Sequence, residues 1–315
     1  MSRALFTFAV LCALAASLHA QDPPDETTPP APPTTADLIE AVANTAAIFA
    51  RTAPGLLAQE VLHQHGRRGF IQTVQQSQRN ASKKKPASKS TANNVTVKLP
   101  QEFHTHDVVS EYTFGQIGDG LAIHELRSIL TIDGRVISAA DEARHALAIG
   151  VQSADDELKH RLLENFERNR LEGAVTDFGQ LILLFSAAAQ SHYRFTPGHE
   201  RLLHGQPMTT LEYKQISGAA GLTVFHDRSM DVRLTEGEIW LRTADLLPLR
   251  ITMSTEAPVG GDLTIHDSAV VDYTPTDFGL APSHIDYMQF LGPDLLVEND
   301  LQYSGYQRLT PGIVP

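Results

Sequence analysis

The sequence has almost no cysteine or tryptophan, and it lacks long apolar segments. Cys12 is the only cysteine among 315 residues, and Trp240 is the only tryptophan. Cys12 lies in a short apolar stretch near the N-terminus that has the features of an export signal, so the exported chain would contain no thiol. This excludes disulfide bonds and thiol catalysis. Beyond that stretch no apolar run approaches the ~20 residues that span a bilayer, so we expect no transmembrane helix.

Positive charge and cofactor motifs are also scarce. The chain has 25 lysines and arginines against 37 aspartates and glutamates, a formal net charge of −12. An acidic surface disfavours binding to nucleic acid and to anionic lipid headgroups. The sequence contains no Gly-x-Ser-x-Gly elbow, no phosphate-binding loop and no dinucleotide fingerprint. We therefore expect a protein that is not an enzyme and that uses no cofactor.

The first 36 residues predict export followed by a linker. Arg3 precedes an apolar run from Ala4 to Ala16, and Ala20 precedes the polar Gln21. These features predict a signal peptide over residues 1–20, cleaved near Ala20, and a location in the periplasm or outside the cell. Residues 21–36 contain six prolines and predict a disordered linker. Residues 37–315 are expected to form a single domain, interrupted by a Lys/Ser-rich loop at 79–94.

The segment Gly237–Met253 has the pattern of a β-hairpin. Apolar and polar residues alternate on both sides of a short connection, which gives each strand one apolar face. Trp240 is expected on the opposite face together with Arg242 and Arg250, where cation–π contacts can form. The apolar set is Ile239, Leu241, Leu249, Ile251 and Met253.

Similar strand patterns recur before and after this hairpin. Asp133-Gly134 is a strong hairpin signal. Regular spacing with short turns predicts one large antiparallel sheet. The other expected strands are 56–75 (one or two, with a turn at Gly66), 108–117, 123–132, 192–196, 200–204, 208–216, 222–226, 230–235, 263–273, 283–290 and 295–306.

Three segments have helical patterns. Thr34 or Thr35 can cap a helix that ends before Pro54, and Ser153 can cap a second one. Residues 178–190 predict a third helix that is apolar nearly all round and must therefore be covered on several sides. The resulting fold class is α+β: a large curved antiparallel sheet, or half-barrel, with helices packed on its concave face. Whether residues 178–190 fill the hollow or leave a cavity stays open.

The hairpin and its surroundings resemble the outer-membrane lipoprotein carrier and sorting superfamily, of the LolA/LolB type. The similarity lies in the segment Gly237–Leu241, in the Leu-Pro-Leu-Arg sequence at Leu247–Arg250, and in the nearby Gly279 and Pro282. Other stretches, such as 125–137, are similar to exported proteins of acidobacterial type. The resemblance implies a half-barrel whose hollow binds lipid or lipoprotein acyl chains. The ligand-binding candidates are then the apolar sheet face, Ile239, Leu241, Leu249, Ile251, Met253, Leu263, Ile265 and Val271.

Two other functions are compatible with the residues. An envelope interaction or structural module could use Trp240, Arg242 and Arg250 to contact a protein partner. A metal-dependent hydrolase could use His104 and His106, which alternation places on one face of a strand. A metal site needs further ligands, so solvated or hydrogen-bonded histidines are the favoured interpretation of this pair.

Overall fold

The computed structural model describes residues 32–67, 99, 101–116, 123–152, 161–162, 169, 171, 177–217, 222–226, 229–260 and 263–309. For residues 222–226, 229–232, 259 and 260 it describes the backbone only. The chain divides into the units Met1–Pro33 and Thr34–Pro315. The signal peptide, most of the linker, the Lys/Ser-rich loop at 79–94 and most of the helix predicted from Ser153 lie outside the described residues. No helix in the described part is long and apolar enough to cross a membrane.

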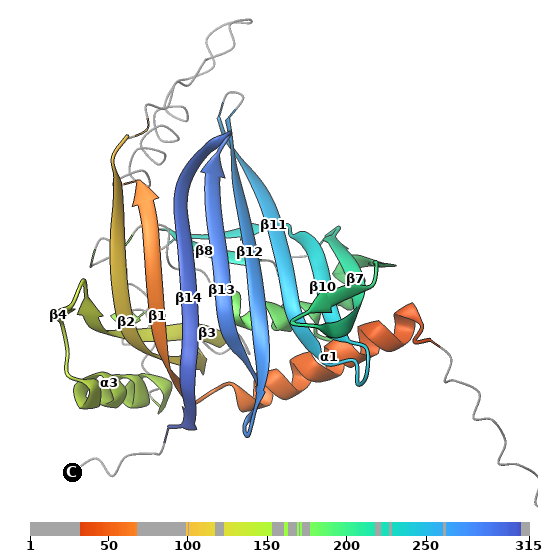
Figure 1. Ribbon diagram of the computed structural model, residues 1–315, viewed down its shortest axis with the longest axis horizontal. Helices are drawn as coiled ribbons and strands as arrows, with labels where there is room; N and C mark the ends of the chain where they lie inside the picture. Colours follow the sequence, from red (N-terminus) through yellow and green to blue (C-terminus); the bar gives the residue numbers. More distant parts are fainter. Residues whose placement is uncertain are drawn as a thin grey trace, which may run out of the picture. The chain divides into compact units, whose positions relative to one another are not determined.

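The second unit is built on an antiparallel sheet of 12 strands that stays open (Figure 1). The order is β4-β3-β2-β1-β14-β13-β12-β11-β10-β7-β5, with β6 paired to β7. This confirms the α+β class with one large sheet. The strands are β1 (Leu56–Arg67), β2 (Phe103–Gln116), β3 (Ile123–Ile132), β4 (Arg135–Val136), β5 (Tyr193–Pro197), β6 (Arg201–Leu203), β7 (Gln206–Gln215), β10 (Glu236–Arg242), β11 (Pro248–Gly260), β12 (Leu263–Thr276), β13 (Gly279–Leu291) and β14 (Asp294–Arg308).

Two features of the sheet follow local sequence signals, and one does not. The hairpin of β10 and β11 forms as the alternation predicts, with Ile239 opposite Ile251. Asp133 and Gly134 join β3 to β4 with φ values of 50° and 76°, the left-handed pair that a tight hairpin requires. In contrast, β1 lies between β2 and the last strand, β14, so the two ends of the domain meet in the middle of the sheet.

Each face of the sheet carries different helices. We call the face that bears Leu62 and Val271 the inner face, and the face that bears Trp240 the outer face. Helix α1 (Thr35–Thr52) and the 3₁₀ helix η1 (Phe178–Phe185) cover the inner face and contact each other (Figure 1). Helix α3 (Ala140–Gln152) covers the outer face of β2 and β3 instead, where Leu147 packs against Leu57 and Leu126.

The start and buried face of α1 agree with the sequence pattern. Thr34 caps the helix, and its side chain and that of Asp37 form a reciprocal capping box. Leu38, Val42 and Phe49 are buried, and the ring of Phe49 meets Phe114 edge-on at 5.3 Å between centroids. This helix therefore anchors the N-terminal end of the domain to β2.

Three local predictions are wrong. Gly66 is not a turn but lies within β1, paired with Val297 and His104; a Cβ there would approach Val297 Cγ2 to 3.2 Å. Strands β8 (Leu222–His226) and β9 (Ser229–Arg233) do not join the large sheet as predicted but pair with each other in a separate two-stranded sheet. The third helix ends at Phe185 and is 3₁₀ rather than α. The carboxylate of Asp177, directly before this helix, accepts a hydrogen bond from Glu125 N of β3.

Candidate ligand-binding site

An unbroken row of aliphatic side chains crosses the inner face. Residues directly opposite one another in an antiparallel sheet share a face, and the strand register links nine such residues on nine strands. None of them is more than 9% exposed. In sheet order the row is Ile132, Val108, Leu62, Leu301, Ile285, Val271, Ile251, Ile239 and Leu211. We call it the aliphatic row.

Helix η1 lies against this face through aromatic contacts. The Phe178 ring lies 4.7 Å from that of Tyr287, and the Phe185 ring lies 4.6 Å from that of Tyr213. The backbone N–H of Ile182 also donates to the Tyr273 hydroxyl at 3.3 Å. All eight residues of η1 are in 3₁₀ conformation, although runs beyond three or four residues are uncommon because the hydrogen bonds are poorly aligned.

The structure brings together the residues that the resemblance assigned to ligand binding. Ile239, Leu241, Ile251 and Val271 are fully buried, and Met253, Ile265 and Leu249 are nearly so. Leu263 is half-buried at the edge of the same cluster. Phe178, Leu181, Ile182 and Phe185 of η1 belong to this cluster. Side chains of η1 therefore occupy the space over this part of the inner face.

A buried ionic cluster lies beside the start of η1. Arg127 Nε donates to both carboxylate oxygens of Glu60, at 2.9 and 2.8 Å, and Arg127 Nη2 donates to Glu125 Oε2 at 2.5 Å. All three side chains are at most 5% exposed. Two carboxylates share one guanidinium, so one negative charge lacks a full counter-charge in a region where charge is poorly solvated.

The second oxygen of Glu125 binds the start of η1. Glu125 Oε1 accepts a hydrogen bond from Gly179 N at 2.5 Å, and Asp177 Oδ1 accepts one from Glu125 N at 2.9 Å. A Cβ at Gly179 would lie 2.5 Å from Glu125 Oε1 and 2.7 Å from the Tyr112 hydroxyl, so only glycine fits. The N-terminus of η1 is thus fixed to β3 by side chains of both segments.

Burial changes the acidity of this cluster. It raises the pKa of Glu125 to about 7, against the opposing attraction of Arg127. Burial alone would lower the pKa of His124, but the hydrogen bond from its Nδ1 to Asp177, 2.7 Å long, and the nearby negative charges raise it overall. Both groups therefore bind a proton more readily than the same side chains do in water.

The inner face becomes polar near the start of β12 and the end of β13, which lie side by side. Asp267 forms an ion pair with Arg233 and accepts hydrogen bonds from the Tyr287 hydroxyl and Gln289 Nε2, at 2.7 and 2.6 Å. All four side chains are at most 8% exposed. The apolar part of the inner face is consequently bounded by a polar cluster on each of two sides.

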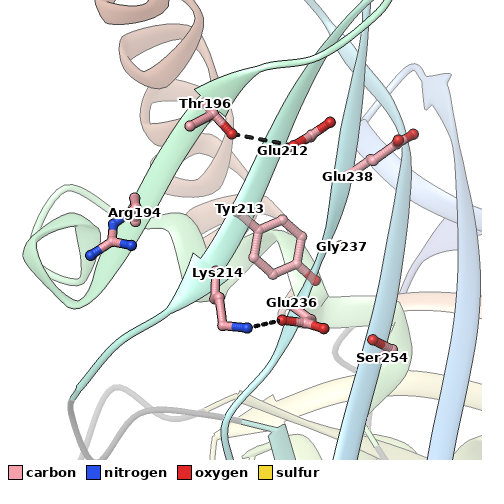
Figure 2. A pocket seen from close by; sticks show the side chains of 9 residues that line it. All are labelled: Arg194, Thr196, Glu212, Tyr213, Lys214, Glu236, Gly237, Glu238 and Ser254. Atoms are coloured by element: carbon pink, nitrogen blue, oxygen red, sulfur yellow. Dashed lines mark hydrogen bonds and ion pairs between the residues drawn. The ribbon is translucent and has the colours of Figure 1, made fainter.

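A groove on the outer face has a different character. It has a volume of about 420 Å³ and runs along β5, β7 and β10 (Figure 2). Lys214 pairs with Glu236 at 2.6 Å, and Thr196 donates to Glu212 at 3.3 Å. Five of its nine lining residues are charged, so an apolar chain bound there would desolvate charged groups.

Trp240 lies on the outer face, as the alternation predicts. Its indole N–H donates to Glu238 Oε2 at 2.8 Å, and the Arg250 guanidinium lies 5.2 Å from the ring centroid. Arg201 from β6 approaches the same ring at 5.8 Å, whereas Arg242 pairs with Asp245. The indole is therefore already partnered by neighbouring side chains.

His104 and His106 contact different carboxylates. His104 Nε2 lies 3.6 Å from Glu102, and His106 Nδ1 lies 2.9 Å from Asp133. Among the described residues, the group of three potential ligands within reach of one ion contains neither of them.

Comparisons with known proteins find similar solved structures but no similar sequence family. No family model and no curated protein sequence match the chain. Among solved structures, a DUF1329 family protein from Desulfovibrio piger matches with 10% identity and a TM-score of 0.30, over 86% of this chain and 92% of that one. A domain described as an outer membrane lipoprotein-sorting protein, from Vibrio parahaemolyticus, matches with 11% identity and a TM-score of 0.34, over 85% and 94%. The MucA/MucB complex from Pseudomonas aeruginosa matches with 12% identity and a TM-score of 0.19, over 84% and 94%. A lipoprotein-sorting domain, the type of protein that the sequence resembles, is thus among the matched structures.

Proposed function

We propose that this protein is an exported, non-enzymatic carrier that binds one acyl chain of a lipid or lipoprotein on the inner face of its sheet. The observation that supports this most is the aliphatic row, which gives nine strands one continuous apolar surface. A chain of methylenes laid across these strands would contact branched aliphatic side chains along its whole length. Apolar burial would supply the binding free energy.

Helix η1 acts as an exchangeable lid in this proposal. Its side chains occupy the inner face when no ligand is bound, and an acyl chain takes their place. A 3₁₀ segment is held by weaker internal hydrogen bonds than an α-helix of the same length. Its polar attachments to the sheet include the bonds to Glu125 and Tyr273. Displacing such a segment costs less than opening a regular helix.

The expected affinity follows from the buried methylenes. Ten methylenes at about 0.8 kcal/mol each give about 8 kcal/mol, which corresponds to a dissociation constant of about 1 μM. Displacing the lid opposes this gain, so we expect palmitate to bind more weakly than this, with a dissociation constant above about 1 μM, at one molecule per chain.

The test is a titration of delipidated protein with palmitate and a fluorescent fatty acid. We expect Phe185→Ala to bind about tenfold more tightly than the wild type, because the ring no longer competes for the space over the sheet; tenfold corresponds to about 1.4 kcal/mol. The same substitution is expected to lower the free energy of unfolding by about 3–5 kcal/mol. Tyr273→Phe removes only the hydroxyl that binds Ile182 N. It should also strengthen palmitate binding, because the lid loses a hydrogen bond to the sheet, and it creates no cavity.

Leu202→Ala is the matched control, because Leu202 is 71% exposed on β6. It should bind palmitate as the wild type does. The proposal is contradicted if neither the wild type nor the two lid variants show saturable binding.

A further inference from the structure

Three ionisable side chains converge on the outer face of β13 and β14. His284 and Asp286 are two residues apart on β13, so they point to the same side. Asp300 of β14 lies directly opposite Asp286. The side chains are 31%, 51% and 39% exposed, respectively. The site is therefore formed by two paired strands in the middle of the sheet and is open to solvent.

The electrostatics of this group are unfavourable without a cation. Like charges directly opposite each other in an antiparallel pair destabilise the sheet, and Asp286 faces Asp300 in this way. Within the described part of the chain, the ion-pair partner of both carboxylates is His284 alone; no lysine or arginine pairs with either. One imidazole cannot neutralise two carboxylates. Arg250 also attracts Asp286, but it is already paired with Asp272. His63 lies directly opposite Asp300 on β1, but it pairs with Asp107.

The distances between the donor atoms match those in a metal site. His284 Nε2 lies 3.4 Å from Asp286 Oδ1 and 3.4 Å from Asp300 Oδ1. Ligands at about 2.0–2.2 Å from a tetrahedral zinc ion are separated from one another by about 3.3–3.6 Å. All three donor atoms lie within 4.8 Å of one another, so small rotamer adjustments bring them around one ion.

We propose that His284, Asp286 and Asp300 bind a divalent transition-metal ion of the zinc type on the outer face. One imidazole nitrogen and two carboxylate oxygens are donors that suit such ions. Water fills the remaining position, as in other sites with three protein ligands. Gln302 Nε2 donates to Asp300 Oδ1 at 3.2 Å and holds this carboxylate in place. The ion would remove the repulsion between the carboxylates of Asp286 and Asp300. This proposal does not depend on the proposed lipid binding.

The test is zinc binding to the full-length protein purified without an affinity tag, measured by calorimetry and equilibrium dialysis. We expect one zinc ion per chain, with micromolar affinity. His284→Ala and Asp300→Asn should each weaken binding at least tenfold, about 1.4 kcal/mol or more. Substitution by cobalt(II) should give the intense visible absorption of a tetrahedral site, and His284→Ala should abolish it.

His266→Ala is the control, because His266 also lies on the outer face, near Glu256 of the neighbouring strand, at 3.9 Å. It should bind zinc as the wild type does. The proposal fails if the wild type binds no zinc at hundred-micromolar concentration, or if the ion that binds is unaffected by both His284→Ala and Asp300→Asn. Circular dichroism of each variant checks that the sheet is intact.

Discussion

Replacing Arg127 with methionine is expected to lower the free energy of unfolding by about 3–5 kcal/mol at pH 8. The guanidinium makes three hydrogen bonds to Glu60 and Glu125, and all three side chains are buried. Methionine keeps much of the volume but leaves two carboxylates in the interior without a counter-charge. Urea unfolding followed by circular dichroism measures the change.

Arg242→Met is the matched control for this experiment. Arg242 pairs with Asp245 through two short hydrogen bonds, but on the surface, where such pairs contribute about 1 kcal/mol or less. A loss of less than 1 kcal/mol for Arg127→Met would mean that the buried cluster does not exist as described. A smaller loss at pH 5 than at pH 8 is also expected, because Glu125 then carries a proton.

The second large effect is a fall in stability as the pH rises towards neutrality. Burial raises the pKa of Glu125 from an ordinary 4.5 to about 7, so the folded state binds more protons than the unfolded state between these values. The contribution of Glu125 is therefore complete below about pH 4.5 and is lost as the pH rises through 7. A shift of this size amounts to about 3 kcal/mol. The raised pKa of His124 acts in the same direction.

Glu125→Gln isolates this contribution. The variant cannot ionise, so the difference in unfolding free energy between wild type and variant should change by about 3 kcal/mol across the interval. The glutamine amide has one oxygen to accept a hydrogen bond, whereas Gly179 N and Arg127 both donate at this position. Its NH₂ group therefore faces one of these two donors, which lowers the free energy of unfolding at every pH by about 1–3 kcal/mol. Glu236→Gln, an exposed carboxyl paired with Lys214, should retain the wild-type pH profile. If the free energy of unfolding of Glu125→Gln followed pH in parallel with that of the wild type, the raised pKa of Glu125 would be contradicted.

Much of the sheet could be predicted because apolar residues recur at alternate positions in its strands. In β10, β11, β12 and β14 this alternation predicts one buried face, although the polar residues Thr255, Asp267 and Asn299 also lie buried on it. The pairing of β1 with β14 could not be predicted. It joins Leu62 to Leu301 across most of the chain, and no local turn signal specifies which distant strand becomes a neighbour.

The buried charges were missed for a related reason. In β3, Glu125 and Arg127 alternate with Leu126 and Ser128, which looks like a strand with its charges in solvent. Both faces are buried because α3 covers the side of Leu126 while η1 covers the side of Glu125. The available signal was Ala143 and Leu147, four residues apart and both buried in α3, but this segment was not among those predicted to be helical. The 3₁₀ form of η1 was missed because its apolar sequence fits either helix type.

The most direct test of an acyl-chain site is photocrosslinking with a palmitate analogue that carries a diazirine near the end of its chain. We expect one adduct per protein, competed by unlabelled palmitate and located on inner-face peptides of β11 to β13 or on residues 178–185 of the lid. Adducts confined to the outer face around Trp240, or labelling that palmitate does not reduce, would contradict binding on the inner face.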